Sequence, residues 1–173
     1  DLVKPRNDGL KNAPAVGSAS APYDLSTKGG SVLRSTANCY VISAPGHYRI
    51  PLVYGNAIKN GATNANAYIS HAATGNSNVL YNFQDHAGHA IDDPWIEKTN
   101  GGANNGIDGA KLVWADEANL VHSPAIKHDG GNAFLEFEVK ASDIQSGNAV
   151  VAVKKGSTIV WSWHLWFAPK DAL

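Results

Sequence analysis

One cysteine and one distant histidine have the side chains that nucleophilic chemistry would need. Cys39 is the single cysteine of the chain, and His164 lies in its last apolar segment. A thiol nucleophile needs a base within hydrogen-bond reach and a third group, here Asn38 or Asp143, to orient that base. No cysteine-hydrolase motif surrounds Cys39, and a free cysteine in an apolar strand usually packs as a small hydrophobic residue. We therefore expect Cys39 to be buried and structural, and the protein not to be an enzyme.

A polar loop holds the residues best suited to bind a metal ion. Its two histidines and three carboxylates are Asp85, His86, His89, Asp92 and Asp93. Zinc accepts imidazole nitrogen and carboxylate oxygen as ligands. However, Gly88 lies in the middle of the cluster and favours an irregular loop over the helix that this spacing would suit. We expect these side chains to order the loop through hydrogen bonds, and the fold to need no metal ion or other cofactor.

The segment 100–109, NGGANNGIDG, has the composition of a calcium-binding turn. Calcium requires hard oxygen ligands, usually from several carboxylates. Asp108 is the single carboxylate here, and the segment does not repeat. Turn chemistry, with glycines at positive φ, is the simpler interpretation.

Aromatic side chains offer a third kind of site. Trp95, Trp166 and Tyr40 are the candidates for an exposed surface that stacks on sugar rings or anchors a protein interface. Trp95 follows Pro94 in a long loop, where burial is not forced. The competing interpretation is that these rings seal the ends of a hydrophobic core.

Composition describes a globular chain with little charge. Its 173 residues are 43% hydrophobic and 17% charged, and the formal net charge is -1. Such a chain has no basic field to attract nucleic acid, and no apolar run approaches the roughly 20 residues of a membrane-spanning helix. The chain lacks methionine even at position 1. We therefore expect it to start after processing or to be part of something larger.

The chain divides by pattern into a leader and a domain. Residues 1–37 contain Pro5, Pro14 and Pro22 without apolar periodicity and are interpreted as an extended linker or leader segment. Residues 38–173 are predicted to form one β-sandwich domain. Within it, residues 85–109 form an unusually long irregular loop.

The last strand is predicted to organise the core. Ile159, Trp161, Trp163, Leu165 and Phe167 alternate along 159–167, while His164 falls on the opposite face. If Lys155 and Gly156 close the preceding turn, then Ala152 pairs with Ile159, Val150 with Trp161 and Ala149 with Ser162. About eight short strands and no convincing long helix predict an all-β, antiparallel, immunoglobulin-like β-sandwich with long irregular loops.

Both ends of the domain carry a resemblance. The motifs are TANCYVI at 36–42, PG at 45–46, LVYGNA at 52–57, GNAVVA at 147–152 and IVWSWHLW at 159–166. Together they resemble a module of secreted Bacteroidetes proteins, found beside immunoglobulin-like repeats or in fimbrillin-like adhesins. The resemblance implies an extracellular, cell-surface or outer-membrane-associated β-sandwich, and it brings no catalytic motif.

Three functions are open at this point. The first is a non-enzymatic surface module of an adhesin, a fimbria-associated protein or another secreted protein, whose partners are other domains or subunits. The second is a carbohydrate-binding module of a secreted enzyme, which would bind host or dietary glycan and expose Trp95 or Trp166. The third is a hydrolase, which requires an accessible Cys39 beside an imidazole.

Overall fold

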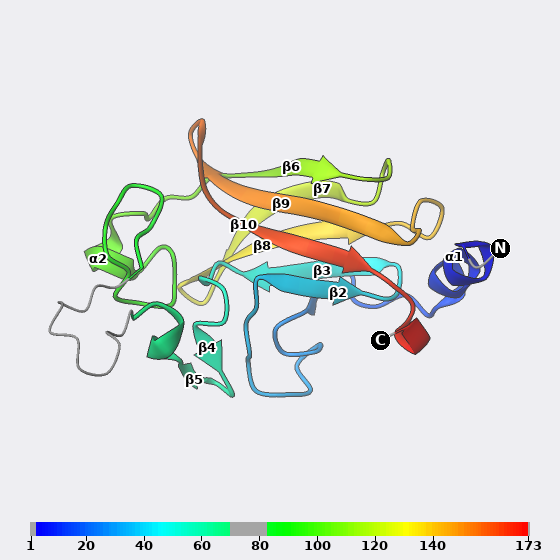
Figure 1. The fold of residues 1–173 in the computed structure, drawn as a ribbon, viewed down its shortest axis with the longest axis horizontal. Helices are drawn as coiled ribbons and strands as arrows, with labels where there is room; N and C mark the ends of the chain where they lie inside the picture. The colour runs from blue at the N-terminus through cyan, green and yellow to red at the C-terminus, as the bar shows by residue number, and fades with distance from the viewer. Residues whose placement is uncertain (1–2, 70–82, 173) are drawn as a thin grey trace, which may run out of the picture.

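The chain folds as two packed β-sheets (Figure 1). The structure, a computed structural model, describes residues 3–69 and 83–172. Sheet A has the strand order β1-β3-β8-β7 and sheet B the order β2-β10-β9-β6, and β4 and β5 form a separate ribbon. The strands are β1 (Tyr23–Asp24), β2 (Cys39–Ile42), β3 (Gly46–Pro51), β4 (Ile58–Lys59), β5 (Ala62–Thr63), β6 (Gly109–Ala115), β7 (His122–Asp129), β8 (Asn132–Val139), β9 (Gly147–Lys155) and β10 (Thr158–Phe167). The predicted all-β sandwich is confirmed.

Helical segments are short and lie outside the two sheets. They are α1 (Val3–Asn12), the 3-10 helix η1 (Ala65–Ala67), α2 (Thr99–Gly102) and the 3-10 helix η2 (Lys170–Ala172). Figure 1 shows α1 and the C-terminus at one end of the sandwich and α2 at the other. The sheets alone therefore build the central layers.

Neither sheet is purely antiparallel, which corrects the prediction. β1 pairs with β3 in parallel, and β2 pairs with β10 in parallel. The remaining pairs within the two sheets are antiparallel. The short connection at 43–45 carries the chain from β2 in sheet B to β3 in sheet A. The immunoglobulin-like topology stays a prediction.

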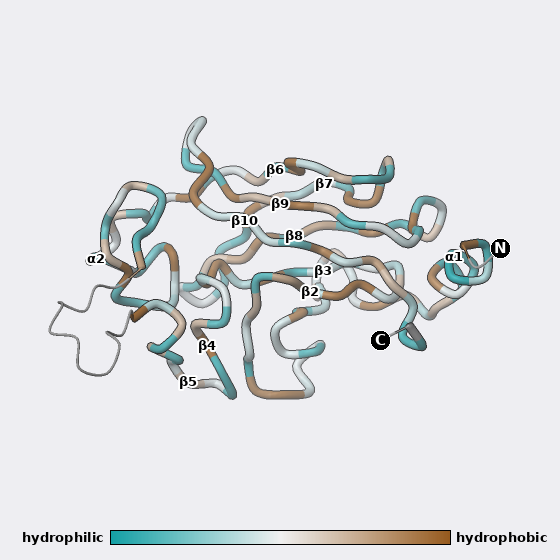
Figure 2. The backbone as a smooth tube through the Cα atoms, viewed as in Figure 1, coloured by the Kyte–Doolittle hydropathy of each residue, from teal (hydrophilic) through white to brown (hydrophobic). Residues whose placement is uncertain are grey.

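Side-chain alternation places the core between the sheets. On β8, Ala133, Leu135, Phe137 and Val139 are buried, as their two-residue period predicts. Figure 2 shows hydrophobic residues within the strands and hydrophilic residues at many of the connecting turns. The inner faces of both sheets thus supply the hydrophobic contacts that hold the sandwich together.

Strand β10 contributes the largest buried side chain. Trp163, Leu165 and Phe167 are at most 1% exposed, and they face the core as predicted. Trp161 is half-buried and packs edge-on against Tyr54, with ring centroids 4.8 Å apart. His164 lies on the opposite face, as predicted.

A β-bulge changes the start of β10 and the register of its hairpin. The pairing with β9 shifts between Ile159 and Trp161, so that Val160 is buried and Ile159 is exposed. Lys155 pairs with Thr158, which leaves 156–157 as the turn. The predicted register is therefore wrong: Ser162 pairs with Ala152, not with Ala149. A bulge inserts one unpaired residue, which strict alternation does not foresee.

Residues 3–37, predicted as part of an extended linker, contain a helix and a short strand. α1 places Leu10 in the core, and β1 extends sheet A. Between them, the Val16 carbonyl accepts a hydrogen bond from the His47 N–H, 2.9 Å away. A Cβ on Gly46 would collide with that carbonyl, so this close approach requires glycine.

A buried carboxylate fastens this segment to the outer face of sheet A. Asp24 is 5% exposed and accepts hydrogen bonds from Arg34 at 2.9 Å and from Arg49 at 3.1 Å. The Arg49 guanidinium also lies 3.8 Å from the centre of the Phe134 ring. These contacts cover Phe134, which points outward from β8 and yet is 2% exposed.

The opposite faces of β10 provide a matched stability test. Trp163→Ala removes a fully buried ring and should lower the free energy of unfolding by about 3–5 kcal/mol. Trp166→Ala, on the outer face of the same strand, should lower it by about 1 kcal/mol or less. Urea unfolding followed by circular dichroism measures both. Equal losses for the two variants would contradict this orientation of β10.

Candidate functional site

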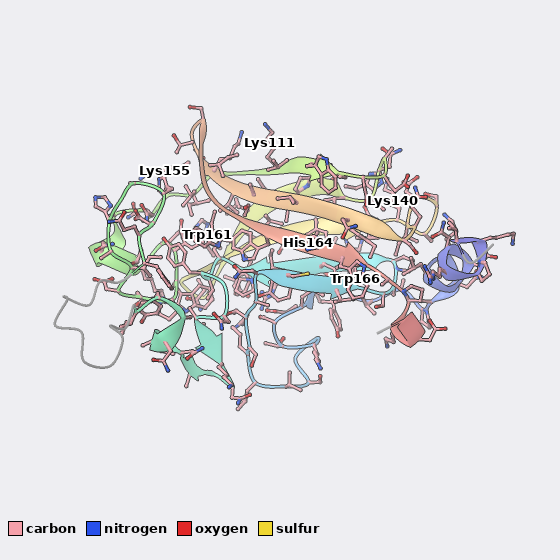
Figure 3. The ribbon with its side chains drawn as sticks, viewed as in Figure 1. Lys111, Lys140, Lys155, Trp161, His164 and Trp166 are labelled. Atoms are coloured by element: carbon pink, nitrogen blue, oxygen red, sulfur yellow. The ribbon has the colours of Figure 1, made fainter. Side chains whose placement is uncertain are left out.

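The outer face of sheet B exposes tryptophans and polar side chains together. We call it the tryptophan face, and its residues are Trp114, Asp116, Asn148, His164 and Trp166. They come from β6, from the residue that follows it, from β9 and from β10. Figure 3 labels His164 and Trp166 side by side on β10. Regular strands therefore position most of the site, which makes it rigid.

Local strand geometry explains why these residues face outward. On β10, His164 and Trp166 alternate with the buried Leu165 and Phe167. On β6, a bulge between Leu112 and Trp114 turns Trp114 outward beside Val150.

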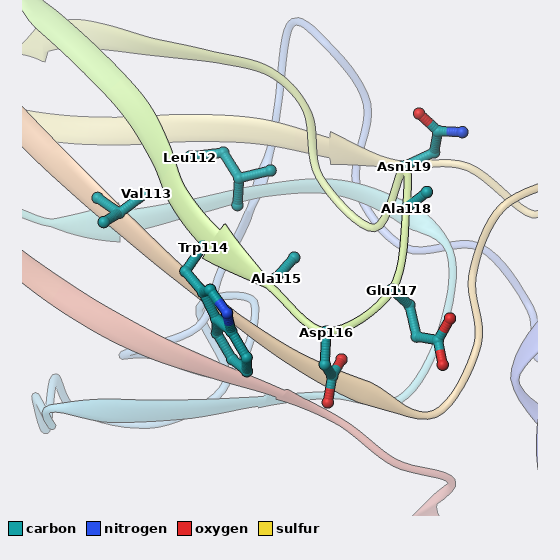
Figure 4. A pocket seen from close by; sticks show the side chains of 8 residues that line it. All are labelled: Leu112, Val113, Trp114, Ala115, Asp116, Glu117, Ala118 and Asn119. Atoms are coloured by element: carbon teal, nitrogen blue, oxygen red, sulfur yellow. The ribbon is translucent and has the colours of Figure 1, made fainter.

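Both indole rings are accessible to solvent. Trp114 is 53% exposed and Trp166 is 39% exposed. Trp114 also lines an open hollow formed by residues 112–119 (Figure 4). In that view the Trp114 and Asp116 side chains extend to the same side of the chain. The two rings flank the strand that carries Asn148.

A chain of hydrogen bonds connects the polar side chains of this face. The Asn148 side-chain amide donates to Asp116 Oδ2 at 3.0 Å, and the Asn148 backbone N–H donates to Asp116 Oδ1 at 2.8 Å. His164 Nε2 lies 2.8 Å from Asn148 Oδ1. Because Asn148 Oδ1 is an acceptor, Nε2 of His164 must carry the proton. Neutral His164 therefore has an acceptor at Nδ1, which makes no hydrogen bond within the described residues.

The same contacts fix the charge of Asp116. The hydrogen bond from the Asn148 backbone, followed by the one from its side chain, lowers the pKa of Asp116 below its ordinary value. Hydrogen bonds to the ionised form favour that form. Asp116 is therefore a negatively charged acceptor at neutral pH.

Cys39 belongs to this surface, which corrects the prediction that it is buried. It is exposed at the start of β2 and pairs in register with His164. On this short strand Tyr40 and Ile42 take the inner face, so Cys39 and Val41 face outward. Partial burial of the Cys39 thiol raises its pKa. Within the described residues no hydrogen bond joins this thiol to the imidazole.

The predicted orienting residues do not contact His164 with their side chains. Asp143 instead binds His122, with Oδ2 and Nε2 2.7 Å apart. Asn38 reaches His164 through the backbone, where its carbonyl accepts the His164 N–H at 2.9 Å. The side chain that orients the His164 ring is Asn148, through the hydrogen bond to Nε2.

Of the three predicted aromatic candidates, Trp166 is exposed and the other two are engaged by the protein. Tyr40 is 6% exposed, and burial raises its pKa to about 12. It cannot form part of an exposed platform, which corrects that expectation. Trp95 is half-buried and packs edge-on against Phe134 at 6.0 Å, and the Lys98 ammonium lies 5.5 Å from its ring centre.

Two of the predicted metal candidates, Asp92 and Asp93, stabilise turns. Asp92 Oδ1 accepts hydrogen bonds from Thr99 at 3.0 Å and from the Asn100 N–H at 2.8 Å. Asp93 accepts the Trp95 N–H at 2.8 Å, whereas His86 is exposed. Across residues 3–69 and 83–172, no three His, Cys, Asp or Glu side chains are placed to hold a metal ion together.

A buried polar network centres on Asp85. Its carboxylate accepts hydrogen bonds from the Asn104 side chain and from the N–H groups of Ala87 and His89, each at 2.9 Å. Burial raises the pKa of Asp85, but these hydrogen bonds outweigh burial, and the pKa lies below its ordinary value. Asn104 also reaches the Tyr54 hydroxyl at 3.3 Å. The network orders the start of the long loop against the core.

Segment 100–109 adopts the predicted turn conformations. Gly101, Gly102 and Gly106 have positive φ, as does Asn100. Asp108 accepts the Gly156 N–H at 3.1 Å and so ties the segment to the β9–β10 turn. Its single carboxylate thus has a structural partner.

Sequence reasoning missed Trp114, Asp116 and Asn148. Trp114 escaped because a bulge, and not simple alternation, decides its face. Asn148 escaped because the predicted hairpin register separated it from Trp166, its actual partner across the strands. The available signal was the position of Asn148, a polar residue at the start of a segment that is otherwise apolar.

Comparison with known proteins adds no relative. No family model, curated protein or solved structure matches the chain. No helix in the described ranges is long and apolar enough to cross a membrane.

The Asp85 network predicts how stability depends on pH. Its carboxylate contributes stability above its unfolded-state pKa, about 3.9, and loses this contribution as the pH falls through the lower folded-state value. Asp85→Asn should lower the free energy of unfolding at neutral pH by on the order of 1–3 kcal/mol. It should also flatten the acid dependence. Thermal unfolding from about pH 7 to about pH 2 tests this, and parallel curves for the two proteins would contradict it.

Proposed function

We propose that the chain is a non-enzymatic recognition module of a secreted or cell-surface protein, with the tryptophan face as its binding surface. The exposure of Trp114 and Trp166 on one face of sheet B carries this proposal. Large aromatic side chains are costly to leave in water and are typical anchors of binding sites. The extracellular location and the adhesin or fimbria-associated setting rest on the motif resemblance.

A carbohydrate-binding module of a secreted enzyme is the second candidate function. It would use the same face, because Trp166 lies beside the hydrogen-bonding side chains of Asn148 and His164. The two candidates differ in the protein to which the module is attached. The remaining domains or subunits of that protein are its expected partners.

Two observations argue against the hydrolase alternative. Cys39 is exposed and pairs in register with His164, as a hydrolase requires, but partial burial raises the pKa of its thiol, which disfavours the reactive thiolate. No hydrogen bond in the described part of the chain joins the Cys39 thiol to the His164 imidazole. A cysteine hydrolase instead requires a base bonded to its nucleophile.

Binding to immobilised ligands tests the proposed function. The probes are printed glycans, collagen, fibronectin and mucin. The wild-type chain should bind at least one of them, and the Trp114→Ala/Trp166→Ala double variant should bind it about tenfold or more weakly.

A matched control removes exposed apolar side chains elsewhere. Val32 and Leu33 are 48% and 71% exposed, and neither lies in sheet B. The Val32→Ala/Leu33→Ala variant should bind like wild type. Binding that survives the tryptophan substitutions, or no binding to any probe, would overturn the proposal.

A further inference from the structure

The side chains of the tryptophan face indicate which class of ligand it binds. This inference about the ligand rests on the proposed function. The first feature of this face is the spacing of the two rings. Trp114 on β6 and Trp166 on β10 are separated by β9, where their partners Val150 and Asn148 are two positions apart. Strand spacings near 4.8 Å and rises near 3.4 Å put their Cα atoms about 12 Å apart. One sugar ring cannot cover both indoles, whereas an extended oligosaccharide can.

Val150 and Asn148 of β9 lie between the rings, and the polar side chains of Asp116 and His164 flank them. Asn148 uses one amide hydrogen for Asp116, which leaves the second available as a donor. His164 Nδ1 is an acceptor in the neutral ring, and the Asp116 carboxylate has remaining lone pairs. Adjacent hydroxyl groups both donate and accept, so a polyhydroxylated ligand matches this mixture.

This surface carries more polar and charged groups than the centre of a typical protein interface. The centre of a protein–protein contact is depleted in charged residues, and a polar rim surrounds it. Here Asn148 and Val150 lie between the aromatic anchors, and the charged Asp116 follows Trp114 by two residues and binds Asn148. Covering this charged side chain with an apolar protein surface would leave it poorly solvated.

The charge of the face selects against anionic ligands. Asp116 is ionised and hydrogen-bonded to Asn148, whose strand neighbour is Trp166. A carboxylated or sulfated sugar stacked on Trp166 would bring like charges close together. The exposed Lys111 lies on the same face opposite Ala152, beyond Trp114 and away from Asp116, so this repulsion acts at the Trp166 end of the face.

We propose that the tryptophan face binds a neutral oligosaccharide, with sugar rings stacked on Trp114 and Trp166 and hydroxyl groups bonded to Asn148, His164 and Asp116. The indoles supply most of the affinity through desolvated stacking. The polar chain fixes the orientation of the sugar because the Asn148 and Asp116 side chains hold each other in place.

Affinity electrophoresis of the full chain tests this proposal. The neutral probes are mixed-linkage β-glucan, xylan and galactomannan, and the acidic probes are alginate and chondroitin sulfate. At least one neutral polysaccharide should retard the wild-type chain, and the acidic ones should not. Trp114→Ala and Trp166→Ala should each weaken retardation about tenfold or more. Leu33→Ala, which lies outside sheet B, should leave it unchanged.

Three results would overturn the inference. They are no retardation by any neutral probe, stronger retardation by the acidic probes, and unchanged retardation in both tryptophan variants. Unfolding midpoints measured on each variant separate lost binding from lost folding.

Periodate separates this inference from the proposed function, because it cleaves the vicinal diols of sugars. Tryptophan-dependent binding to an immobilised ligand should disappear when that ligand is oxidised. If such binding survives oxidation, the ligand is protein, and the oligosaccharide inference fails while the proposed function stands. If binding is independent of the tryptophans, both fail.

Discussion

The two faces of β10 are the constraint on which the rest of the structure depends. Trp163, Leu165 and Phe167 must leave water, and burying each large apolar side chain contributes roughly 1.5–3 kcal/mol. Because a strand alternates, fixing these residues inward also fixes His164 and Trp166 outward. The core and the candidate binding surface are therefore two consequences of one strand. A one-residue slip would bury the polar side chains and expose the core.

Predictions based on alternation succeeded where strands are long and strongly patterned. The inward residues of β8 and the C-terminal half of β10 follow a simple period of two. The same rule failed at the start of β10, because that strand contains a bulge. The expectations for Cys39 and Tyr40 rested on residue type and were wrong, because the four-residue strand β2 turns Tyr40 inward and Cys39 outward. Sequence patterns therefore identified the sandwich but not its irregular positions.

The contacts that shape the rest of the molecule are non-local, which explains what the sequence could not reveal. Residues 1–37 lack periodicity, yet Asp24 joins Arg34 and Arg49 on sheet A. Asp85 meets Asn104 across the long loop, and Asp116 meets Asn148 across two strands. Each pair satisfies polar groups that would otherwise lose hydrogen bonds on folding. The sequence therefore revealed the candidate surface only in part, because Trp166 and His164 share the last strand while Asp116 and Asn148 come from other parts of the chain.

Hydroxyl-radical footprinting of the native chain, read by mass spectrometry for each tryptophan, tests the two-faced strand most directly. The account predicts ready oxidation of Trp114 and Trp166, with Trp163 protected until the protein unfolds. Oxidation of Trp163 at a rate similar to that of Trp166 in the folded protein would contradict it. So would protection of both Trp114 and Trp166 in the free chain.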